Sequence, residues 1–411
     1  MSGRRTGVSS ALVTKPVHGR GLLRPPVVSV VSVCVVVGIA VARWIERQPL
    51  GIDSAVYRAG AEAVARGHPL YGSFDATPLP FTYPPVASIG FLPLAAIPPQ
   101  LAWGLMGTLS TLALGVVVRA TIGHVRPAWT GRKRIVCGSV LFALALQPVW
   151  ETIAFGQVNL VIMAFVVVDV LNLRGSRFCG LLTGVAAAIK LTPLIFVVHL
   201  VVTGRHADAV RLLTAFAFLQ AFGAAALPAD SAEYWTSAIM CAERWGTSYA
   251  ANQSLNAVLN RLTAAWPYTF VISLALVALS LGVAILLARR FESAGRPLEA
   301  ILSTAMIGLV ISPISWPHHW VWVAPVCLVL LGRLAGHPWD GRDHWGSALT
   351  FAGVVVVFSG AGLLAMPIGH GRELSRGIPG TLLGNLYLLC TLVVVAAAVL
   401  GTRRAGKDGN A

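Results

Sequence analysis

Asp53 is the first residue whose type and position could do chemistry. It stands in the stretch "GIDSAVYRAG" of a chain with only 16 carboxylates among 411 residues. A carboxylate held beside an apolar segment could act as a general base at a membrane surface. Asp53 could equally be the N-cap of a helix that begins near Ser54, although Ser54 could cap as well and neither residue has the capping-box partner three positions on. The two roles are compatible, because a cap fixes the position of the carboxylate.

A pair of histidines is the second candidate. In "ISPISWPHHWVW" two prolines interrupt an apolar run, and His318 and His319 lie at the break between Trp316 and Trp320. Tryptophans are typical of the aromatic belt at a membrane interface, but a belt does not explain the histidines. Adjacent residues on a helix point about 100° apart, which argues against a two-histidine metal chelate. The pattern favours one histidine that reaches an inward-facing site.

Lys190 is the third candidate, in "GLLTGVAAAIKLTPLIFVVHL". It lies about 18 Å along a helix from the start of its apolar run, too far for comfortable snorkelling to the interface. An ionisable residue at such a depth is a functional candidate by default. With Thr192 and Pro193 breaking the helix beside it, Lys190 could bind an anionic group such as a lipid phosphate. The alternative is a lysine that faces a wet crevice without a role.

Two clusters of amide side chains complete the set, in "FGQVN" and "ANQSLN". Amides suit hydrogen bonding to sugar hydroxyls, and they also suit helix capping, so alone they are weak signals. The residues concerned are Gln157, Asn159, Asn252, Gln253 and Asn256.

The elements that position these residues are membrane helices. The chain is 56% hydrophobic and 11% charged, against about a quarter charged in soluble proteins. Long apolar runs recur along it, each approaching the length that crosses a bilayer. We predict an all-α polytopic membrane protein with about 11–13 hydrophobic helices, at 27–45, 85–98, 101–118, 135–149, 158–172, 178–203, 208–227, 267–290, 299–314, 317–332, 347–366 and 381–401.

The basic loops predict the sidedness of these helices. Arginines and lysines concentrate at 119–134, 174–177, 289–296, 333–342 and 403–407, which the positive-inside rule places in the cytoplasm. Two topologies are possible. The first places all of these loops in the cytoplasm. It requires that the region from residue 85 to residue 118 crosses the membrane once and that the region from 178 to 203 enters and leaves on one side. The second makes 85–98 and 101–118 two full spans and lets 178–203 cross once, which puts "RPAWTGRKR" outside, against the charge rule.

Both topologies give one integral domain, 27–401, between a basic cytoplasmic tail, 1–26, and a second tail, 402–411. Both also place the loops 46–83 and 228–266 outside. From Ser54 onward, apolar and charged residues follow helical spacing on opposite faces, with Arg58, Glu62 and Arg66 on the charged face. The first outer loop should therefore contain an amphipathic helix in the membrane interface.

Other classes are excluded or disfavoured by composition. The net charge of +15 comes mainly from the short basic loops and forms no stripe interleaved with aromatics, so nucleic acid is not a predicted partner. The six cysteines indicate neither a disulfide framework nor a zinc site. A transporter or lipid flippase stays an alternative because broken helices and an intramembrane lysine occur there too. However, no inverted repeat is evident, and Asp169 is the only clear intramembrane acid.

The order of these motifs resembles glycosyltransferase family 87, which consists of actinobacterial membrane enzymes of the GT-C fold. The motifs are "GIDSAVYRAG", "PLYG", "FTYPP", "FGQVN", "GLLTGVAAAIKLTP", "NQSLN" and "SPISWPHHW", and they run from about Asp53 to Trp320. The resemblance is strongest to mannosyltransferases that build phosphatidylinositol mannosides in α-1,2 linkage. Arabinofuranosyltransferases share the same plan, so the sugar is less secure than the fold.

The resemblance implies a polyprenyl-phosphate-mannose donor, a glycolipid acceptor and an active site at the outer face of the plasma membrane. It assigns the general base of an inverting displacement to Asp53. His318 or His319 and Lys190 would stabilise the leaving phosphate. No metal or other cofactor is predicted, and the residues do not decide the oligomeric state. Besides Lys190, we predict substrate contacts from Tyr57, Arg58, Tyr83, Gln157, Asn159, Asn252, Gln253, Asn256, Trp316 and Trp320.

Overall fold

The computed structural model describes residues 50–240, 249, 251–263, 268–336, 342–364 and 378–408. Within these ranges the chain is mainly helical, and the described backbone forms no strand beyond an isolated bridge between Phe74 and Thr77. The all-α fold class is confirmed. The predicted first span, 27–45, and the tail 1–26 lie outside the described residues.

The helices of the N-terminal half are α2 (Ile52–Arg66), α3 (Pro85–Gly90), α4 (Leu92–Ala95), α5 (Pro99–Val125), α6 (Pro127–Thr130), α7 (Lys133–Ala143), α8 (Gln147–Phe155), α9 (Asn159–Val167), the π-helical η1 (Val168–Asn172), α10 (Leu181–Ile189), the 3-10 turn η2 (Thr192–Leu194) and α11 (Ile195–Val202). Those that follow are α12 (His206–Ala226), α13 (Pro228–Thr236), η3 (Ala238–Met240), α14 (Leu255–Thr263), α15 (Thr269–Ser293), α16 (Pro297–Ile311), η5 (Pro317–Trp322), α17 (Val323–Leu334), α18 (Arg342–Phe358), α19 (Ala361–Leu364), α20 (Ile378–Leu383) and α21 (Leu386–Asp408).

The described helices form a membrane protein with fewer full-length spans than the apolar segments suggest. Four of them are long and apolar enough to cross a bilayer: α5, α12, α15 and the segment Trp345–Leu363. Helices α7 and α8 together pass the same test, with a bend of 78° between them. The other apolar segments are divided into shorter helices, because prolines and backbone breaks interrupt them.

In the region 85–118, the division into shorter helices decides how many times the chain crosses the membrane. Its first part forms α3 and α4, of six and four residues. At 1.5 Å per residue α3 is only about 9 Å long, against roughly 30 Å of hydrocarbon, so it cannot cross. Helix α5, with 27 residues, can. The region therefore crosses once, as the first predicted topology requires.

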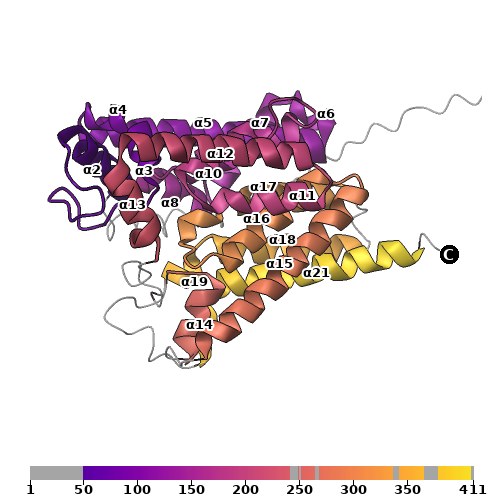
Figure 1. The fold of residues 1–411 in the computed structure, drawn as a ribbon. Coiled ribbons are helices and arrows are strands. Elements are labelled where there is room, and N and C mark those ends of the chain that lie inside the picture. Colours follow the sequence, from indigo (N-terminus) through magenta and orange to yellow (C-terminus); the bar gives the residue numbers. More distant parts are fainter. Residues whose placement is uncertain are drawn as a thin grey trace, which may run out of the picture.

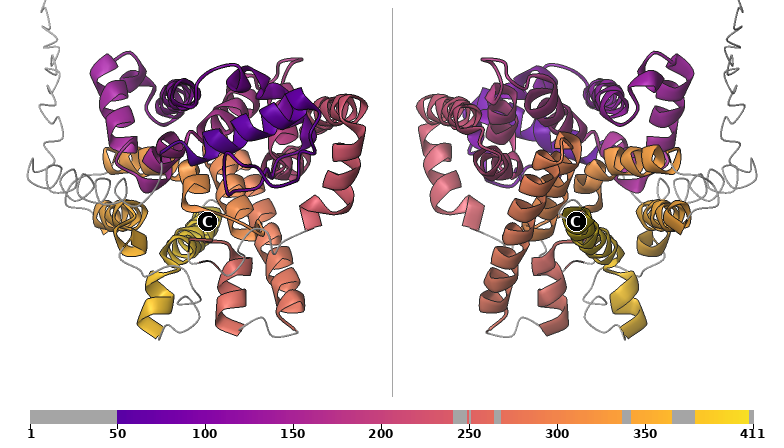
Figure 2. Two further views of the ribbon diagram at one scale, coloured as in Figure 1. Left: turned by 90° about the vertical axis from the view of Figure 1, so that its left-hand side faces the viewer. Right: turned by 90° about the vertical axis from the view of Figure 1, so that its right-hand side faces the viewer.

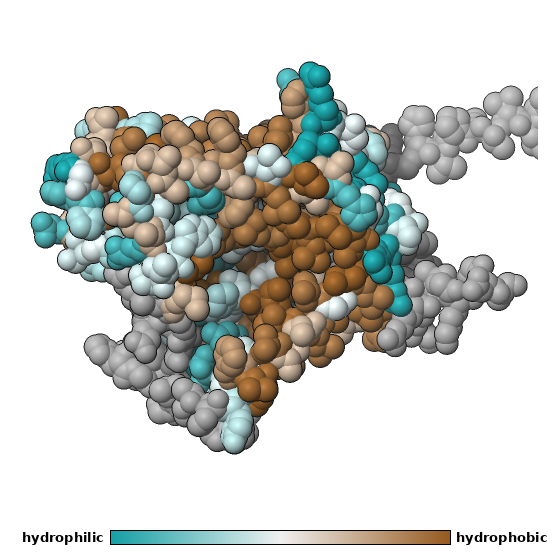
Figure 3. All heavy atoms as spheres, viewed as in Figure 1, coloured by the Kyte–Doolittle hydropathy of each residue, from teal (hydrophilic) through white to brown (hydrophobic). Residues whose placement is uncertain are grey.

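The basic loops gather at one end of the molecule. Arg126, after α5, donates two hydrogen bonds to the Gly332 carbonyl near the end of α17, at 3.1 and 2.8 Å. Arg174, after η1, pairs with Glu292 near the end of α15. Figure 3 shows hydrophilic atoms at both ends of the molecule and an apolar band between them. This separation agrees with a single cytoplasmic end, as the positive-inside rule predicts.

The segment broken at Lys190 forms a hairpin. Gly180, before α10, packs so tightly on α12 that a Cβ there would lie 2.2 Å from the Asp208 carbonyl oxygen. Further along, Gln220 of α12 donates to the Ala188 carbonyl at 3.2 Å. Helix α10 therefore runs parallel to α12, from the basic end inward, and α11 returns to the start of α12 (Figure 1). The hairpin enters and leaves on one side, again as the first topology requires.

The opposite end holds α2, the loop after it and α13 (Figure 1). The 15-residue α2 confirms the predicted amphipathic helix, and Gly67 ends it with a φ of 69°. Asp230 of α13 accepts a hydrogen bond from the Leu70 amide at 2.8 Å. Figure 2 shows the N-terminal helices as one layer and most of the C-terminal helices as a second. The two layers meet along a boundary that carries the residues described next.

Candidate active site

Asp53 lies inside the first turn of α2 rather than at its cap. The helix begins at Ile52, and Gly51, with a φ of 74°, holds the N-cap position without a side-chain capping bond. The cap interpretation of Asp53 is therefore wrong. Its carboxylate still lies at the positive end of the helix dipole, where negative charge is favoured. The role of the Asp53 side chain therefore depends on the groups that surround its carboxylate.

The start of α2 is pressed against the end of α8. The Gly51 amide donates to the Ala154 carbonyl at 2.8 Å. Gly156, which ends α8 with a φ of 68°, touches Ser54 so closely that a Cβ there would lie 2.8 Å from the Ser54 Cβ. Glycine is needed at position 156 both for its left-handed backbone and for this approach. The contact brings "FGQVN" next to the first turn of α2.

Gln157 lies at the centre of a buried hydrogen-bonded cluster. Its Oε1 accepts hydrogen bonds from the Tyr57 and Tyr83 hydroxyls and from the Val158 amide, the last two at 3.0 and 2.9 Å. The two tyrosine hydroxyls also contact each other at 3.0 Å. With Oε1 occupied in this way, the amide NH₂ of Gln157 is the part that remains for Asp53, to which it contributes a hydrogen bond. We call Gln157, Tyr57, Tyr83 and Val158 the Gln157 cluster.

The environment of Asp53 favours its neutral form more than water would. Burial of the carboxyl among protein atoms raises its pKa from 3.8 to about 7. The positive charge of Lys190 and the hydrogen bond from Gln157 oppose the rise and lower the pKa in part. A carboxyl with a pKa near 7 can both take up and release a proton at neutral pH, which suits a general base.

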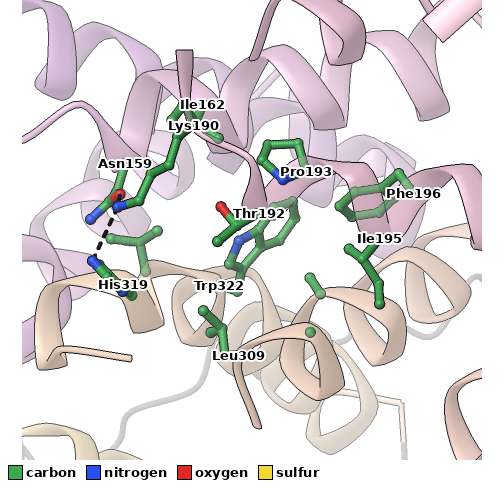
Figure 4. Close-up of a pocket in the computed structure, with 13 residues that line it drawn as sticks. Asn159, Ile162, Lys190, Thr192, Pro193, Ile195, Phe196, Leu309, His319 and Trp322 are labelled. Atoms are coloured by element: carbon green, nitrogen blue, oxygen red, sulfur yellow. Dashed lines mark hydrogen bonds between the residues drawn. The ribbon is translucent and has the colours of Figure 1, made fainter. Parts of the chain in front are cut away.

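Lys190 stands at the tip of the hairpin, where α10 ends in extended backbone with φ −148° and ψ 125°. Its Nζ donates to Asn159 Oδ1 at 2.8 Å and lies 3.0 Å from His319 Nε2 (Figure 4). The same Nζ lies 5.7 Å from the centre of the Tyr83 ring. The Lys190 ammonium therefore joins the hairpin to α9 and to the histidine junction, and its charge acts on Asp53.

The histidine junction is fixed through its backbone. The His318 carbonyl accepts hydrogen bonds from Asn159 Nδ2 at 2.8 Å and from Thr152 Oγ1 at 3.0 Å. The His318 ring packs edge-to-face on Phe155, and His319 packs on His318 in the same way. Short 3-10 geometry in η5, which begins at a proline, lets both adjacent histidines turn toward the boundary between the layers.

A pocket opens beside Lys190 and His319. It has an empty volume of about 480 Å³, part of which is open to the surroundings. Its polar end is formed by Asn159, Lys190 and His319. Away from them Figure 4 shows mainly apolar side chains from the hairpin, α16 and η5. These include Ile195, Phe196, Leu309 and Trp322. The lining of the pocket is therefore polar at one end and apolar at the other.

Several predicted contact residues lie elsewhere. Arg58 points away from the Gln157 cluster: its Nε donates to the Ile97 carbonyl at 3.1 Å and its guanidinium pairs with Glu62 at 2.7 Å. Trp320 is fully buried against Phe358 and Tyr387, so it belongs to the core and not to an aromatic belt.

The amides of "ANQSLN" hold the histidine junction from behind. Asn252 Oδ1 accepts the Ser315 amide at 2.9 Å, and Gln253 Nε2 donates to the Gly384 carbonyl at 2.7 Å. Both side chains are fully buried: Asn252 supports the junction, whereas Gln253 holds the backbone at Gly384 and Tyr387. Asn256 bonds along its own helix to Asn260.

Trp316 packs on Tyr249, with ring centres 5.8 Å apart.

Of the residues predicted from the sequence, the structure brings together Asp53, Tyr57, Tyr83, Gln157, Asn159, Lys190, His318 and His319.

Glu151 was not among the sequence-predicted residues. It lies in α8, is buried, and places Oε2 3.8 Å from His318 Nδ1. An acid just after an apolar run is rare enough to be a signal, but its partner lies 167 positions away and could not be read from the pattern. In the described ranges, no group of three or more His, Cys, Asp or Glu side chains could hold a metal ion. The expectation of no metal stays a prediction.

Comparison with known proteins adds the family. The model of glycosyltransferase family 87 matches residues 81–313. A polyprenol-phosphate-mannose-dependent alpha-(1-2)-phosphatidylinositol mannoside mannosyltransferase from Mycolicibacterium smegmatis is 32% identical over 400 residues, which cover 90% of this chain and 88% of that protein. A polyprenol-phosphate-mannose-dependent alpha-(1-2)-phosphatidylinositol pentamannoside mannosyltransferase from Mycobacterium tuberculosis is 31% identical, with coverage of 92% and 90%.

Among solved structures, ArnT from Cupriavidus metallidurans bound to undecaprenyl phosphate matches 93% of this chain and 79% of that chain. Its identity is 16% and its TM-score 0.34, too low to establish a shared fold. The sequence relatives are sufficient without it. Because the family model covers more than half of the chain and relatives above 30% identity cover most of it, the chain is a glycosyltransferase that belongs to glycosyltransferase family 87.

Proposed function

We propose that the chain is an inverting membrane mannosyltransferase. It moves mannose from polyprenyl-phosphate-mannose to a phosphatidylinositol mannoside or a related lipoglycan, in α-1,2 linkage. The names of the relatives support this donor, linkage and class of acceptor. The observation that carries the proposal is one shared site: a carboxyl with a pKa near 7 faces Lys190 beside a pocket that is polar at one end and apolar at the other.

In this proposal Asp53 is the general base. It takes the proton from the acceptor hydroxyl as that oxygen attacks the anomeric carbon of the donor. The bond from the anomeric carbon to the phosphate oxygen breaks, and the phosphate leaves with the electron pair. One displacement inverts the anomeric centre, so a β-linked donor gives an α-linked product through an oxocarbenium-like transition state. The proton ends on Asp53 and the charge on the departing phosphate.

Lys190 and His319 would meet that phosphate. Their polar atoms lie 3.0 Å apart at the polar end of the pocket, with Asn159 bonded to the same ammonium. A positive group aimed at developing charge is among the strongest contributions to catalysis. Because the leaving group is a phosphate monoester, it needs no strong general acid. The apolar end of the pocket would take the first prenyl units of the donor.

The site would face the outer side of the plasma membrane. It lies nearer to α2 and α13 than to the basic end, which the positive-inside rule assigns to the cytoplasm. Both lipid substrates could then stay in the outer leaflet during transfer. No soluble nucleotide-sugar domain is needed for such a reaction, since the sugar arrives on a lipid.

A membrane assay tests the proposal. Labelled polyprenyl-phosphate-mannose and phosphatidylinositol mannoside acceptors are supplied to membranes with wild-type protein or with Asp53→Asn. Transfer by wild type, and none by an equally abundant and folded mutant, is the expected result. Retained activity in Asp53→Asn would remove the base from the mechanism. Transfer only from polyprenyl-phosphate-arabinofuranose would replace the sugar, and no transfer from either donor would contradict the proposal.

A further inference from the structure

The strongest unexplained feature of the site is the number of hydrogen bonds that one neutral side chain, Gln157, accepts. Gln157 is buried, and three separate donors converge on its Oε1 from α2, from the segment before α3 and from its own neighbour. An oxygen held by three donors fixes the plane of the amide and settles which of its two ends is the NH₂.

The backbone around Gln157 is also fixed by hydrogen bonds and close packing. Its carbonyl accepts a hydrogen bond from Ser110 of α5 at 3.1 Å, and its amide donates to the Thr152 carbonyl at 2.8 Å. One residue earlier, Gly156 lies against Ser54, the neighbour of Asp53. Hydrogen bonds therefore hold the Gln157 backbone next to the first turn of α2.

We infer that Gln157 is the positioning residue of the base: its fixed NH₂ donates to the Asp53 carboxylate and holds it for proton transfer, while Tyr57 and Tyr83 hold the Gln157 amide in that orientation. This inference rests on the proposed role of Asp53. It gives Gln157, Tyr57 and Tyr83 a different role from the substrate contacts that their motifs suggested.

The chemical effect of such a bond has a definite sign. A donor to a carboxylate stabilises the ionised form and therefore lowers the pKa, in opposition to the effect of burial. The other titratable or charged groups that act on Asp53 are Lys190 from the hairpin, Tyr57 from α2 and Tyr83 from the segment before α3. Of these Lys190 lowers the pKa, whereas the tyrosines are neutral at physiological pH. Loss of the Gln157 donor should therefore leave Asp53 protonated over a wider range of pH.

Two substitutions separate positioning from structure. Gln157→Leu keeps the size of the side chain and removes the donor. Gln157→Glu keeps an oxygen for Tyr57, Tyr83 and Val158 but replaces the donor with a second acid. A hydrogen bond to a charged group contributes about 1.5–3 kcal/mol, or roughly one to two pKa units. We expect the pKa of Asp53 to rise by about one unit in Gln157→Leu and by more in Gln157→Glu.

The matched control is Gln147→Leu. Gln147 is a second buried glutamine of the same region, bonded to the Tyr387 hydroxyl at 2.8 Å and outside the Gln157 cluster. The Gln147→Leu variant also loses a buried amide, but it keeps the donor to Asp53. It should lower thermal stability and leave the pKa of Asp53 where it is in wild type.

The first readout is the infrared carboxyl band of Asp53, identified by its absence in Asp53→Asn and titrated in purified protein. It requires no activity, so it stays informative if the donor or acceptor has been assigned wrongly. The second is the pH profile of kcat/KM. Gln157→Leu should lose roughly tenfold below neutral pH and progressively less above it, as the base ionises at higher pH.

An Asp53 band that titrates in both Gln157 variants as in wild type would overturn the inference, and so would an equal shift in Gln147→Leu. Failure of mannose transfer with a shifted band would instead contradict the proposed function and keep the inference about the carboxyl. If Gln157→Leu does not fold, Gln157→Glu decides the question, because it retains the three bonds to the oxygen.

Discussion

A partly buried carboxyl group that also feels the charge of a lysine, as Asp53 feels that of Lys190, is subject to two opposing effects. Burial favours the protonated acid and the lysine charge favours the carboxylate, and burial is the larger of the two. The resulting pKa of about 7 makes the protonation state sensitive to small changes around neutrality. Two predictions at the scale of the residue follow from this balance.

The first concerns activity. If Asp53 acts as the base, only its ionised form is competent, so kcat/KM should rise with pH through an inflection near pH 7 and level off above it. The measurement is the pH profile of mannose transfer, with enzyme stability checked at each pH. An inflection near the ordinary aspartate value, about pH 4, would contradict the role of the buried carboxyl.

The second concerns stability. Because the pKa is higher in the folded protein than in the unfolded chain, folding is favoured while Asp53 is protonated, and this contribution is lost as the pH rises through about 7. Asp53→Asn removes the ionisation. We expect the mutant to be inactive yet more stable than wild type at alkaline pH, with the difference shrinking below neutral pH. Thermal unfolding at several pH values measures it, and a mutant less stable at alkaline pH would contradict it.

The third prediction concerns the leaving group. Lys190→Gln keeps a polar side chain near Asn159 and removes the charge, and His319→Gln removes the ring. Each should reduce kcat by about 100-fold, the usual effect of deleting one group that stabilises developing charge. Arg58→Gln is the matched control, because Arg58 is a cation near the site that points to Ile97. Losses of similar size in all three variants would mean that general charge, and not placement, matters.

At the scale of the element, the close packing of α10 on α12 holds the Lys190 hairpin in place. A Cβ on Gly184 would lie 2.5 Å from the Leu212 carbonyl oxygen, so Gly184→Val should force the helices apart. Overpacking of this kind costs about 1–3 kcal/mol. Gly282→Ala is the control, since Gly282 of α15 has open space around it. Thermal unfolding should show a loss in the first variant only, and equal effects would contradict the tight contact.

The elements differ in how far the sequence predicted them. Helical spacing from Ser54 predicted α2, because an interfacial helix displays its two faces in the pattern itself. The first of the two predicted topologies, which places every basic loop on one side, requires the segment 178–203 to return to its own side. The pattern could not predict that Asp53 lies inside the first turn, because Gly51 adopts the N-cap through a backbone angle that no periodicity records.

The site was predicted less completely, for a physical reason. Lys190 and His319 were each found as unusual residues and Asn159 as part of a weak amide signal, but only tertiary packing decides which of them meet. The same packing uses Asn252 and Gln253 to hold backbone, although amides of either use look identical in sequence. The sequence shows that a buried polar residue needs a hydrogen-bond partner, but it does not show which residue that partner is.

At the scale of the whole molecule, the distribution of charge makes a prediction about sidedness. Asp75 is exposed in the loop after α2, and Arg177 is exposed at the basic end. In a variant whose six cysteines are replaced by serine, a cysteine at position 75 should react with a membrane-impermeant thiol reagent in intact cells. A cysteine at position 177 should react only after the membrane is permeabilised. The opposite pattern would place the site in the cytoplasm.

The boundary between the two layers has a consequence for how the enzyme treats its donor. Asp53, Gln157 and Lys190 belong to the N-terminal side of the chain, whereas His319 comes from η5 on the other side. Any movement that parts the layers also separates His319 from Lys190, and with it the two groups assigned to the departing phosphate. In the proposed mechanism, a molecule with its layers apart would therefore be unable to transfer the sugar.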